Sequence, residues 1–305
     1  MSARAQSWRP LLGATGLGTG LVLIYTGLIS GADAITKFIA GGYAAPQLFC
    51  LSGLVVVVLS VALNQLQGSQ AGLHTRCPRA MAVRAGATVI ACTAFFYAFR
   101  ALPFAEVFLF IGLMPILSGI LSGLILGEHV RPIVWGALGL GFVGMLFLFP
   151  AGLSGVSIGH GFALLASVAG TVSMIMARYI GQYEHNALAQ VFYPNLAVFA
   201  IMAVALPFVW EPMPPADLIW VFAYATLLFV ARWVLVVALR LLAAYAVTPL
   251  LNLQFVWMVL LGAVFFGEVP AAGTYLGAGL VVLTSLFLVW EQLAPGAERM
   301  RTARA

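Results

Sequence analysis

Runs of about 20 predominantly apolar residues recur along the whole chain, and each is long enough to cross a hydrocarbon core of about 30 Å as a helix. Hydrophobic residues make up 63% of the 305 residues and charged residues only 8%, with a mean hydropathy of +1.07. This composition excludes an ordinary soluble domain, in which about 25% of residues are charged. The strands of an outer-membrane barrel would alternate apolar and polar residues, and these runs do not. The sequence therefore predicts an all-α integral membrane protein.

Glycine, proline and polar segments divide the apolar runs into ten predicted transmembrane helices. The predicted spans are 12–38, 45–63, 82–100, 104–126, 132–150, 158–181, 188–208, 217–239, 246–266 and 270–290. Only a few residues follow Arg100 before the next run, so we expect the third and fourth spans to be tight antiparallel neighbours, and likewise the eighth and ninth. Gly127 and Gly267 are predicted to end helices.

The positively charged residues set the predicted orientation, because Lys and Arg favour the cytoplasmic side of a membrane. Of the 14 Lys and Arg residues, Lys37 and Arg100 fall on the outer side when the N-terminus is cytoplasmic, and Arg232 falls within a span. The others fall on the cytoplasmic side, so both termini are predicted there. The net charge of +5 does not indicate a nucleic-acid partner, since the arginines lie in short loops and tails.

Two segments resemble each other at an offset of 140 residues, namely 98–128 and 238–268. The matched pairs include Arg100/Arg240, Gly127/Gly267 and Glu128/Glu268. The repeat unit therefore holds five spans, and an odd number places the second copy in the membrane upside down. This predicts two halves, 1–150 and 151–305, related as inverted repeats, which is typical of secondary transporters with a substrate site between the halves.

The repeated segments read FYAFRALPFAEVFLFIGLMPILSGILSGLILGE (96–128) and LLAAYAVTPLLNLQFVWMVLLGAVFFGEVP (241–270), and each is followed by a helix rich in small residues. In these motifs the chain resembles the EamA type of the drug/metabolite transporter superfamily. The resemblance implies ten helices in a five-plus-five inverted repeat, no cofactor and a bacterial inner-membrane location. Within the superfamily, the chain is most similar to transporters of S-adenosylmethionine, riboflavin, amino acids and other metabolites. An arginine that often follows the start of the second helix in that group is absent here, where Ser52 lies near its place.

Arg232 is the charged residue that lies deepest in a predicted span, about two-thirds along 217–239. A charge within the hydrocarbon region costs several kcal/mol unless it is paired or faces water. Arg232 therefore faces a central cavity and binds an acidic group of a substrate, or it snorkels about 10 Å to the cytoplasmic interface, or it pairs with an acid for packing.

Three further charged residues are candidates for gating or ion coupling. Asp33 and Lys37 are four residues apart and so lie on one helix face, where they can neutralise each other. They are predicted at the outer end of the first span, either as a structural pair or at the mouth of the substrate path. Glu106 is either a proton-coupling carboxylate or an acid favoured by the dipole at a helix start.

Uncharged polar and aromatic residues within the spans are further candidates for binding a polar substrate. They are Tyr25, Tyr97, Asn195, Asn252, Gln254 and Trp257. Each either hydrogen-bonds substrate without the desolvation cost of a charge or simply joins two helices. Asn252 and Gln254 cannot share a helix face, so we expect at most one of them in a cavity.

The predicted function is that of a secondary transporter for a small polar organic metabolite, and not that of an enzyme. The HExxH motif of membrane-embedded zinc enzymes is absent from the sequence, as are a metal-ligand cluster and a nucleotide-binding loop. A riboflavin or other vitamin importer is the alternative substrate class, and a channel is the alternative mechanism. Protons are the candidate coupling ion, the lipid bilayer is the surrounding partner, and both a monomer and a homodimer stay open.

Overall fold

The computed structural model describes residues 9–66, 72–127, 157–184, 186–242 and 250–268, together with isolated positions between 132 and 143 and between 247 and 287. All regular structure in these segments is helical. The long helices are α2 (Arg9–Ala40), α3 (Ala45–Leu66), α4 (Pro78–Ala101), α8 (Ile158–Tyr183), α9 (Ala187–Ala205) and α10 (Pro215–Leu241). Shorter elements are α5 (Phe104–Ile111), α6 (Met114–Leu121), a π-helix (Ser122–Leu126), a 3₁₀ turn (Leu206–Phe208) and α12 (Gln254–Phe266).

Six helices of the described segments are long and apolar enough to cross a membrane, so the chain is a multi-pass membrane protein. Their positions agree with six of the predicted spans to within a few residues. The predicted spans 132–150 and 270–290 lie almost entirely outside the described residues. Glu128, which the sequence pairs with Glu268, also lies outside them.

The segment predicted as the span 104–126 is helical but is not one regular α-helix, because two turn residues, Gly112 and Leu113, separate α5 from α6. Pro115 in the first turn of α6 has no N–H for an intrahelical bond, which favours a helix start there. The segment predicted as 246–266 also turns, at Asn252 and Leu253, before α12.

The ends of these two segments have matching backbone conformations. Gly127 (φ 66°) follows the π-helix and Gly267 (φ 63°) follows α12, and both are left-handed, a conformation that glycine adopts without steric cost. The prediction that these glycines end helices is therefore confirmed.

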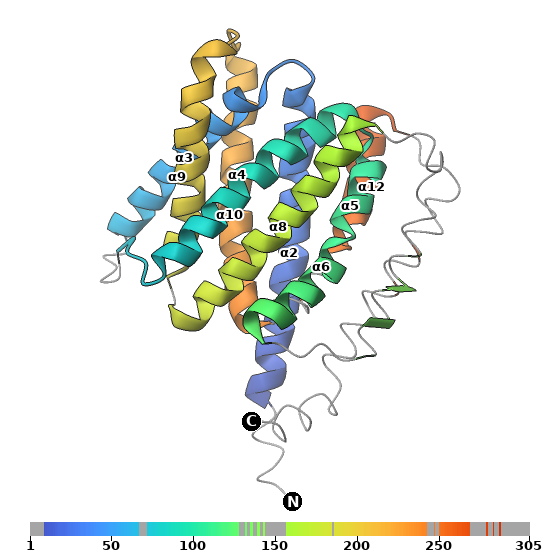
Figure 1. The fold of residues 1–305 in the computed structure, drawn as a ribbon. Coiled ribbons are helices and arrows are strands. Elements are labelled where there is room, and N and C mark those ends of the chain that lie inside the picture. The colour runs from blue at the N-terminus through green and yellow to red at the C-terminus, as the bar shows by residue number, and fades with distance from the viewer. Residues whose placement is uncertain are drawn as a thin grey trace, which may run out of the picture.

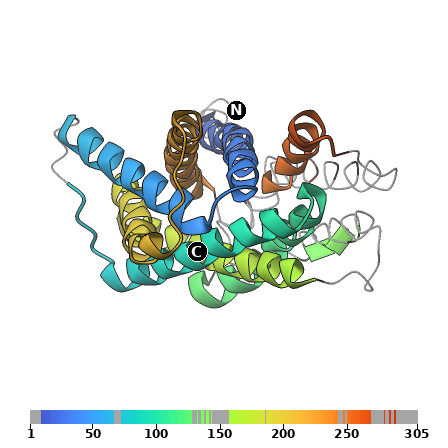
Figure 2. The same cartoon turned by 90° about the horizontal axis from the view of Figure 1, so that it is seen from above.

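The helices form two facing rows, which the view from above separates (Figure 2). One row consists of α10, α2 and α12, and the other of α4, α8 and α5–α6, with α3 and α9 packed against each other beside them (Figure 1). The expected neighbours α4 and α5 do contact each other, but α4 packs most extensively against α8, just as α10 packs against α2. Each row thus contains one strongly packed pair of long helices.

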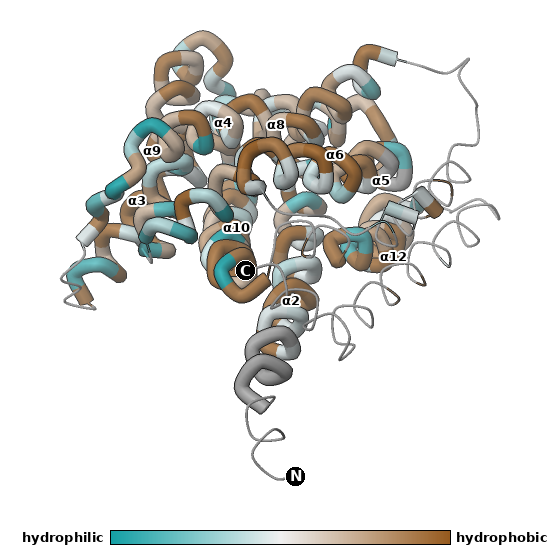
Figure 3. The backbone as a smooth tube through the Cα atoms, turned by 60° about the horizontal axis from the view of Figure 1, so that its bottom comes forward, coloured by the Kyte–Doolittle hydropathy of each residue, from teal (hydrophilic) through white to brown (hydrophobic). Residues whose placement is uncertain are grey.

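The distribution of polarity suits a lipid environment. Large apolar side chains cover the outside, including Phe208 (86% exposed) and Val204 (74% exposed), and hydrophobic stretches run along the helices of both rows (Figure 3). Polar side chains are instead buried between helices, and the hydroxyls of Ser30 and Thr171 donate to carbonyls one turn back in α2 and α8. Such bonds satisfy hydroxyls that hydrocarbon would leave unpaired.

Two glycines allow the close approach of helix ends. A Cβ added to Gly18 in α2 would lie 2.8 Å from Leu242 Cγ, and one added to Gly159 in α8 would lie 2.8 Å from Ala101 Cβ and 2.9 Å from Leu102 Cγ. The two contacts therefore join the start of α2 to the end of α10, and the start of α8 to the end of α4.

Replacing Gly159 with alanine is expected to lower the thermal unfolding midpoint in detergent, because Ala101 Cβ cannot move aside without shifting its helix. Overpacking of this kind costs about 1–3 kcal/mol. Gly161→Ala is the matched control, since a Cβ on Gly161 meets nothing within 4 Å and alanine favours the helix by about 1 kcal/mol. Equal stability of the two variants would contradict the close contact.

Candidate substrate-binding cavity

A cavity of about 170 Å³ lies between the two rows of helices. Its wall takes residues from α2, α3, α4, α8, α10 and α12, so it belongs to both rows. The charged lining residues are Asp33, Arg84 and Arg232. Aromatic rings of Tyr25, Phe49, Phe95, Phe99 and Tyr224 form much of the remaining wall. An internal space with a few polar groups among apolar ones is typical of a small-molecule site.

Arg232 projects from α10 into this cavity rather than snorkelling to an interface. Its Nη1 donates a hydrogen bond to Asn195 Oδ1 on α9 (3.1 Å), and its Nη2 lies 3.1 Å from Cys92 Sγ on α4. Asn195 is itself held by a bond from its Nδ2 to the Val191 carbonyl (2.7 Å). These contacts position the guanidinium, but none of them neutralises its charge.

Arg84 is a second arginine of the cavity wall, and the sequence interpretation missed it by assigning it to the cytoplasmic side. It lies on α4 and is only 6% exposed. Its Nη2 donates to the Gln190 carbonyl (3.1 Å) and its Nη1 to the Ser173 carbonyl (3.4 Å), while Nε has no hydrogen-bond partner. Its position almost two turns inside the helix that begins at Pro78 is the signal that could have shown its burial.

Asp33 lies on the cavity wall and not at an outer helix end. Its Oδ2 accepts a hydrogen bond from Gln254 Nε2 at the start of α12 (2.7 Å). The expected pairing of Asp33 with Lys37 is therefore wrong, although the two residues lie one turn apart on α2. As predicted, only one of the two neighbouring amides lines the cavity, and it is Gln254 rather than the buried Asn252.

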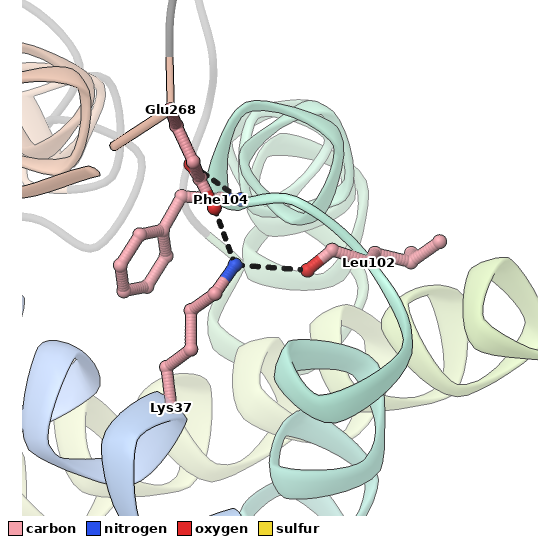
Figure 4. A network of polar contacts seen from close by, with 4 residues as sticks. All are labelled: Lys37, Leu102, Phe104 and Glu268. Atoms are coloured by element: carbon pink, nitrogen blue, oxygen red, sulfur yellow. Dashed lines mark hydrogen bonds and ion pairs between the residues drawn. The ribbon is translucent and has the colours of Figure 1, made fainter. Parts of the chain in front are cut away.

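Lys37 forms an ion pair with Glu268, just beyond the end of α12, with Nζ 2.6 Å from Oε1 (Figure 4). Nζ also donates to the Leu102 carbonyl (3.3 Å), and Glu268 Oε2 accepts from the Phe104 amide (3.4 Å). The ammonium lies 4.7 Å from the centroid of the Phe104 ring, within the range of a cation–π contact. This cluster joins the end of α2 to the start of α5 and the end of α12.

Some of the other predicted site residues lie at the cavity and others lie away from it. Tyr25 lines the cavity, and Asn195 reaches it through Arg232. Tyr97 packs its ring against Phe162 (centroids 5.4 Å apart) and is not part of the cavity wall. Trp257 is 44% exposed and lies against Gly27, also away from the cavity wall.

Glu106 lies in the first turn of α5 and faces His160 at the start of α8, with Oε2 3.3 Å from Nε2. The His160 Nδ1 accepts from the Ser157 amide (2.9 Å) as part of a capping box, which leaves Nε2 as the protonated nitrogen that faces Glu106. Glu106 therefore connects two helix starts, as a structural acid would, and it does not line the cavity.

A larger and more open depression of about 530 Å³ lies between the ends of α2 and α10. Here Tyr43 donates a hydrogen bond to Asp217 (2.5 Å), and Gln47 Nε2 donates to the Glu211 carbonyl (2.7 Å). The bond to the Asp217 carboxylate raises the pKa of Tyr43 above its usual value. The depression is acidic and lies at the end of α2, the start of α10 and the loops beside them, so the deeper cavity with two arginines is the better candidate for a substrate site.

Comparison with known proteins supports a membrane transporter. The chain is 28% identical over 173 residues to a protein named as a riboflavin transporter of Rhizobium johnstonii, and the match covers 56% of each chain. The match thus spans only about half the length of this relative. The fold is also that of a protein of known crystal structure, with a TM-score of 0.70 at 18% identity over 94% of this chain and 98% of the other. No model of a protein family matches the sequence.

Breaking the Lys37–Glu268 ion pair is expected to destabilise the protein, because the two side chains are only 16% and 27% exposed and the remaining charge would be left without its partner. Lys37→Met and Glu268→Gln should each lower the free energy of unfolding. The loss of unfolding free energy in the double variant should be smaller than the sum of the two single losses by about 1–2 kcal/mol. Unfolding titrations in mixed micelles measure this coupling. Glu211→Gln, an exposed acid, should have little effect, and additive losses in the double variant would show that the pair does not interact.

Proposed function

We propose that this chain is a secondary transporter of the EamA type, which moves a small polar organic metabolite across a bacterial inner membrane by alternating access. The observation that carries the proposal is the internal cavity, whose wall is shared by the two rows of helices and holds three charged side chains. Charged residues within membrane helices mark substrate or ion pathways. On this proposal the protein acts as a carrier rather than as an enzyme or a channel.

Recurring backbone features support an inverted repeat of five plus five helices. At the offset of 140 residues, Leu102 and Leu242 cap α4 and α10 in similar extended conformations, and Leu113 and Leu253 make equivalent turn bonds of 3.1 Å. At an offset of 141, Gly18 and Gly159 make the equivalent close approaches to these capping leucines.

The directions of the equivalent helices also favour inversion. Gly159 lies beside Leu102, to which Lys37 bonds, so α8 starts where α2 ends. Gly18 lies 19 residues before Lys37, about 28 Å along the helix. The two related contacts therefore lie at opposite ends of the molecule. In our proposal 1–150 and 151–305 are the two repeats, and both termini are cytoplasmic.

Gating and coupling are assigned to two groups of residues. The Lys37–Glu268 pair closes one end of the path between α2, α5 and α12, and it must break when that end opens. Asp33 is the proposed proton-coupling carboxylate, because it lies in the cavity and its Gln254 partner leaves it other acceptor positions.

A second candidate function is the import of riboflavin or another vitamin. It is favoured by the similarity to the riboflavin transporter of Rhizobium johnstonii and by the aromatic rings of the wall, against which a flat ring system can pack.

Counterflow in proteoliposomes tests the proposed function. Purified protein is reconstituted, loaded with unlabelled compound and supplied with labelled compound from a panel of amino acids, S-adenosylmethionine, flavins and nucleosides. A carrier gives saturable uptake that is accelerated by substrate on the opposite side. Ohmic current without counterflow would instead identify a channel, and an absence of flux for the whole panel would count against this substrate range.

The role of Arg232 is tested with the compound found by counterflow. Arg232→Gln is expected to raise KM at least about tenfold, the equivalent of losing one charged hydrogen bond, while folded protein still reaches the membrane. Arg100→Gln is the matched control, because Arg100 is exposed at the end of α4 and does not line the cavity. Unchanged kinetics in Arg232→Gln would remove Arg232 from the substrate site.

A further inference from the structure

The charges on the cavity wall do not balance. Among the described lining residues, Arg84 and Arg232 are cations and Asp33 is the one acid, which leaves a net positive charge when Asp33 is ionised and a larger one when it is protonated. Arginine stays charged in proteins even when it is buried. The cavity is therefore electropositive in either state of Asp33.

Neither arginine has an acidic partner within the described part of the chain. The hydrogen bonds of Arg84 go to two backbone carbonyls, and those of Arg232 go to an amide and a thiol. Of the other acids in these segments, Glu268 pairs with Lys37 and Glu106 faces His160, both outside the cavity. Asp33 is engaged by Gln254. The buried guanidinium of Arg84 and the partly buried one of Arg232 thus face one space without a carboxylate bonded to either.

The unused hydrogen-bonding capacity points in the same direction. Arg84 is almost fully buried, yet its Nε donates to no group, and a buried donor without an acceptor is destabilising. A carboxylate accepts from guanidinium groups with good geometry and also supplies the missing negative charge. A neutral ligand would satisfy the hydrogen bonds but would leave the charge uncompensated.

The wall of the cavity limits the ligand further. The rings of Phe95, Phe99 and Tyr25 would contact the non-acidic part of a ligand. A small acid with an apolar or aromatic body matches this wall.

We propose that the cavity binds a small organic monoanion, whose carboxylate interacts with Arg84 and Arg232 while its apolar part packs against the aromatic wall. This inference rests on the proposed transport function, since it names the substrate class of the same site. Its test does not require transport, because Cys92 lies beside Arg232 and retains partial exposure, and so reports the local potential.

The experiment compares an anionic and a cationic thiol reagent at Cys92. In a Cys50→Ser/Cys77→Ser protein, the rate of labelling at Cys92 is measured with 2-sulfonatoethyl methanethiosulfonate and with 2-(trimethylammonio)ethyl methanethiosulfonate. Each rate is divided by the rate at which the same reagent reacts with free 2-mercaptoethanol. The intrinsic reactivity of the thiol cancels in the ratio of the two. We expect the normalised ratio to favour the sulfonate at least about tenfold, as an unscreened positive charge several ångströms away would produce.

Variants and competing ligands make the result specific. Arg84→Gln should reduce the preference for the sulfonate several-fold, Arg84→Lys should largely retain it, and Arg100→Gln should leave it unchanged. Benzoate should slow labelling more than benzamide, which has nearly the same shape without the charge. A normalised ratio of one or less in the parent protein, or equal protection by benzoate and benzamide, would overturn the proposal.

The outcome is distinguishable from a failure of the proposed function. Labelling that favours the sulfonate, together with no counterflow of the panel or of benzoate, would leave the anion site in place and count against transport through it. Counterflow of a neutral compound, together with equal normalised labelling of Cys92 by the two reagents, would support the transport function and exclude an organic anion as the substrate.

Discussion

Hydrocarbon cannot solvate polar groups, and this constraint determines most of what the structure shows. Every backbone amide and carbonyl within the bilayer needs a partner in the protein, which makes helices the available form for spans of this composition. Hydroxyls such as those of Thr26, Ser30 and Thr171 bond to carbonyls of their own helices. Charges cannot be satisfied so locally. Several are placed in contacts at helix ends, as Lys37 is with Glu268, and others on the wall of the internal cavity, as Arg84, Asp33 and Arg232 are. The positions of these charges therefore mark both the cavity and the cluster at one end of the helix rows.

The two rows make similar contacts at opposite ends, and this has an energetic consequence for the proposed mechanism. Lys37 bonds to the carbonyl that ends α4, and Arg178, which corresponds to it at an offset of 141, bonds to the carbonyls of Leu239 and Arg240 at the end of α10. Cations at C-terminal helix ends are favourable because the carbonyls there carry partial negative charge. If the end at Lys37 opens while the end at Arg178 closes, similar interactions are lost and gained. Two states of similar free energy are what a carrier needs, since a small difference in ligand affinity can then shift their populations.

The sequence predicts the parts of this fold that depend on composition and on repetition. Six spans agree with long apolar runs, and the ends at Gly127 and Gly267 agree with helix-ending glycines, because hydrophobicity and left-handed backbone are local properties. Which partner a charged side chain chooses is not local. The spacing of Asp33 and Lys37 predicts a contact between them, yet their partners Gln254 and Glu268 are more than 200 residues away in the chain. The break at Gly112 was missed because the apolar run continues through it. The burial of Arg84 was missed because Arg84 lies close enough to a helix start to resemble a residue at the membrane interface.

The ion pair of Lys37 also has properties that suit a contact that must break. A fully exposed pair is worth little, about 0–1 kcal/mol, and would hold nothing closed, whereas a fully buried one loses several kcal/mol when its partners separate without water. The Lys37 and Glu268 side chains keep 16% and 27% exposure, so water can reach both groups as they part. The aromatic rings of Phe104 and Phe266 lie 4.7 and 5.5 Å from the ammonium and shield the pair in the closed arrangement. In the proposed mechanism, a contact of this intermediate strength can close the path in one state. In the other state, hydration of the two side chains can replace it at a cost within the few kcal/mol that separate functional conformations.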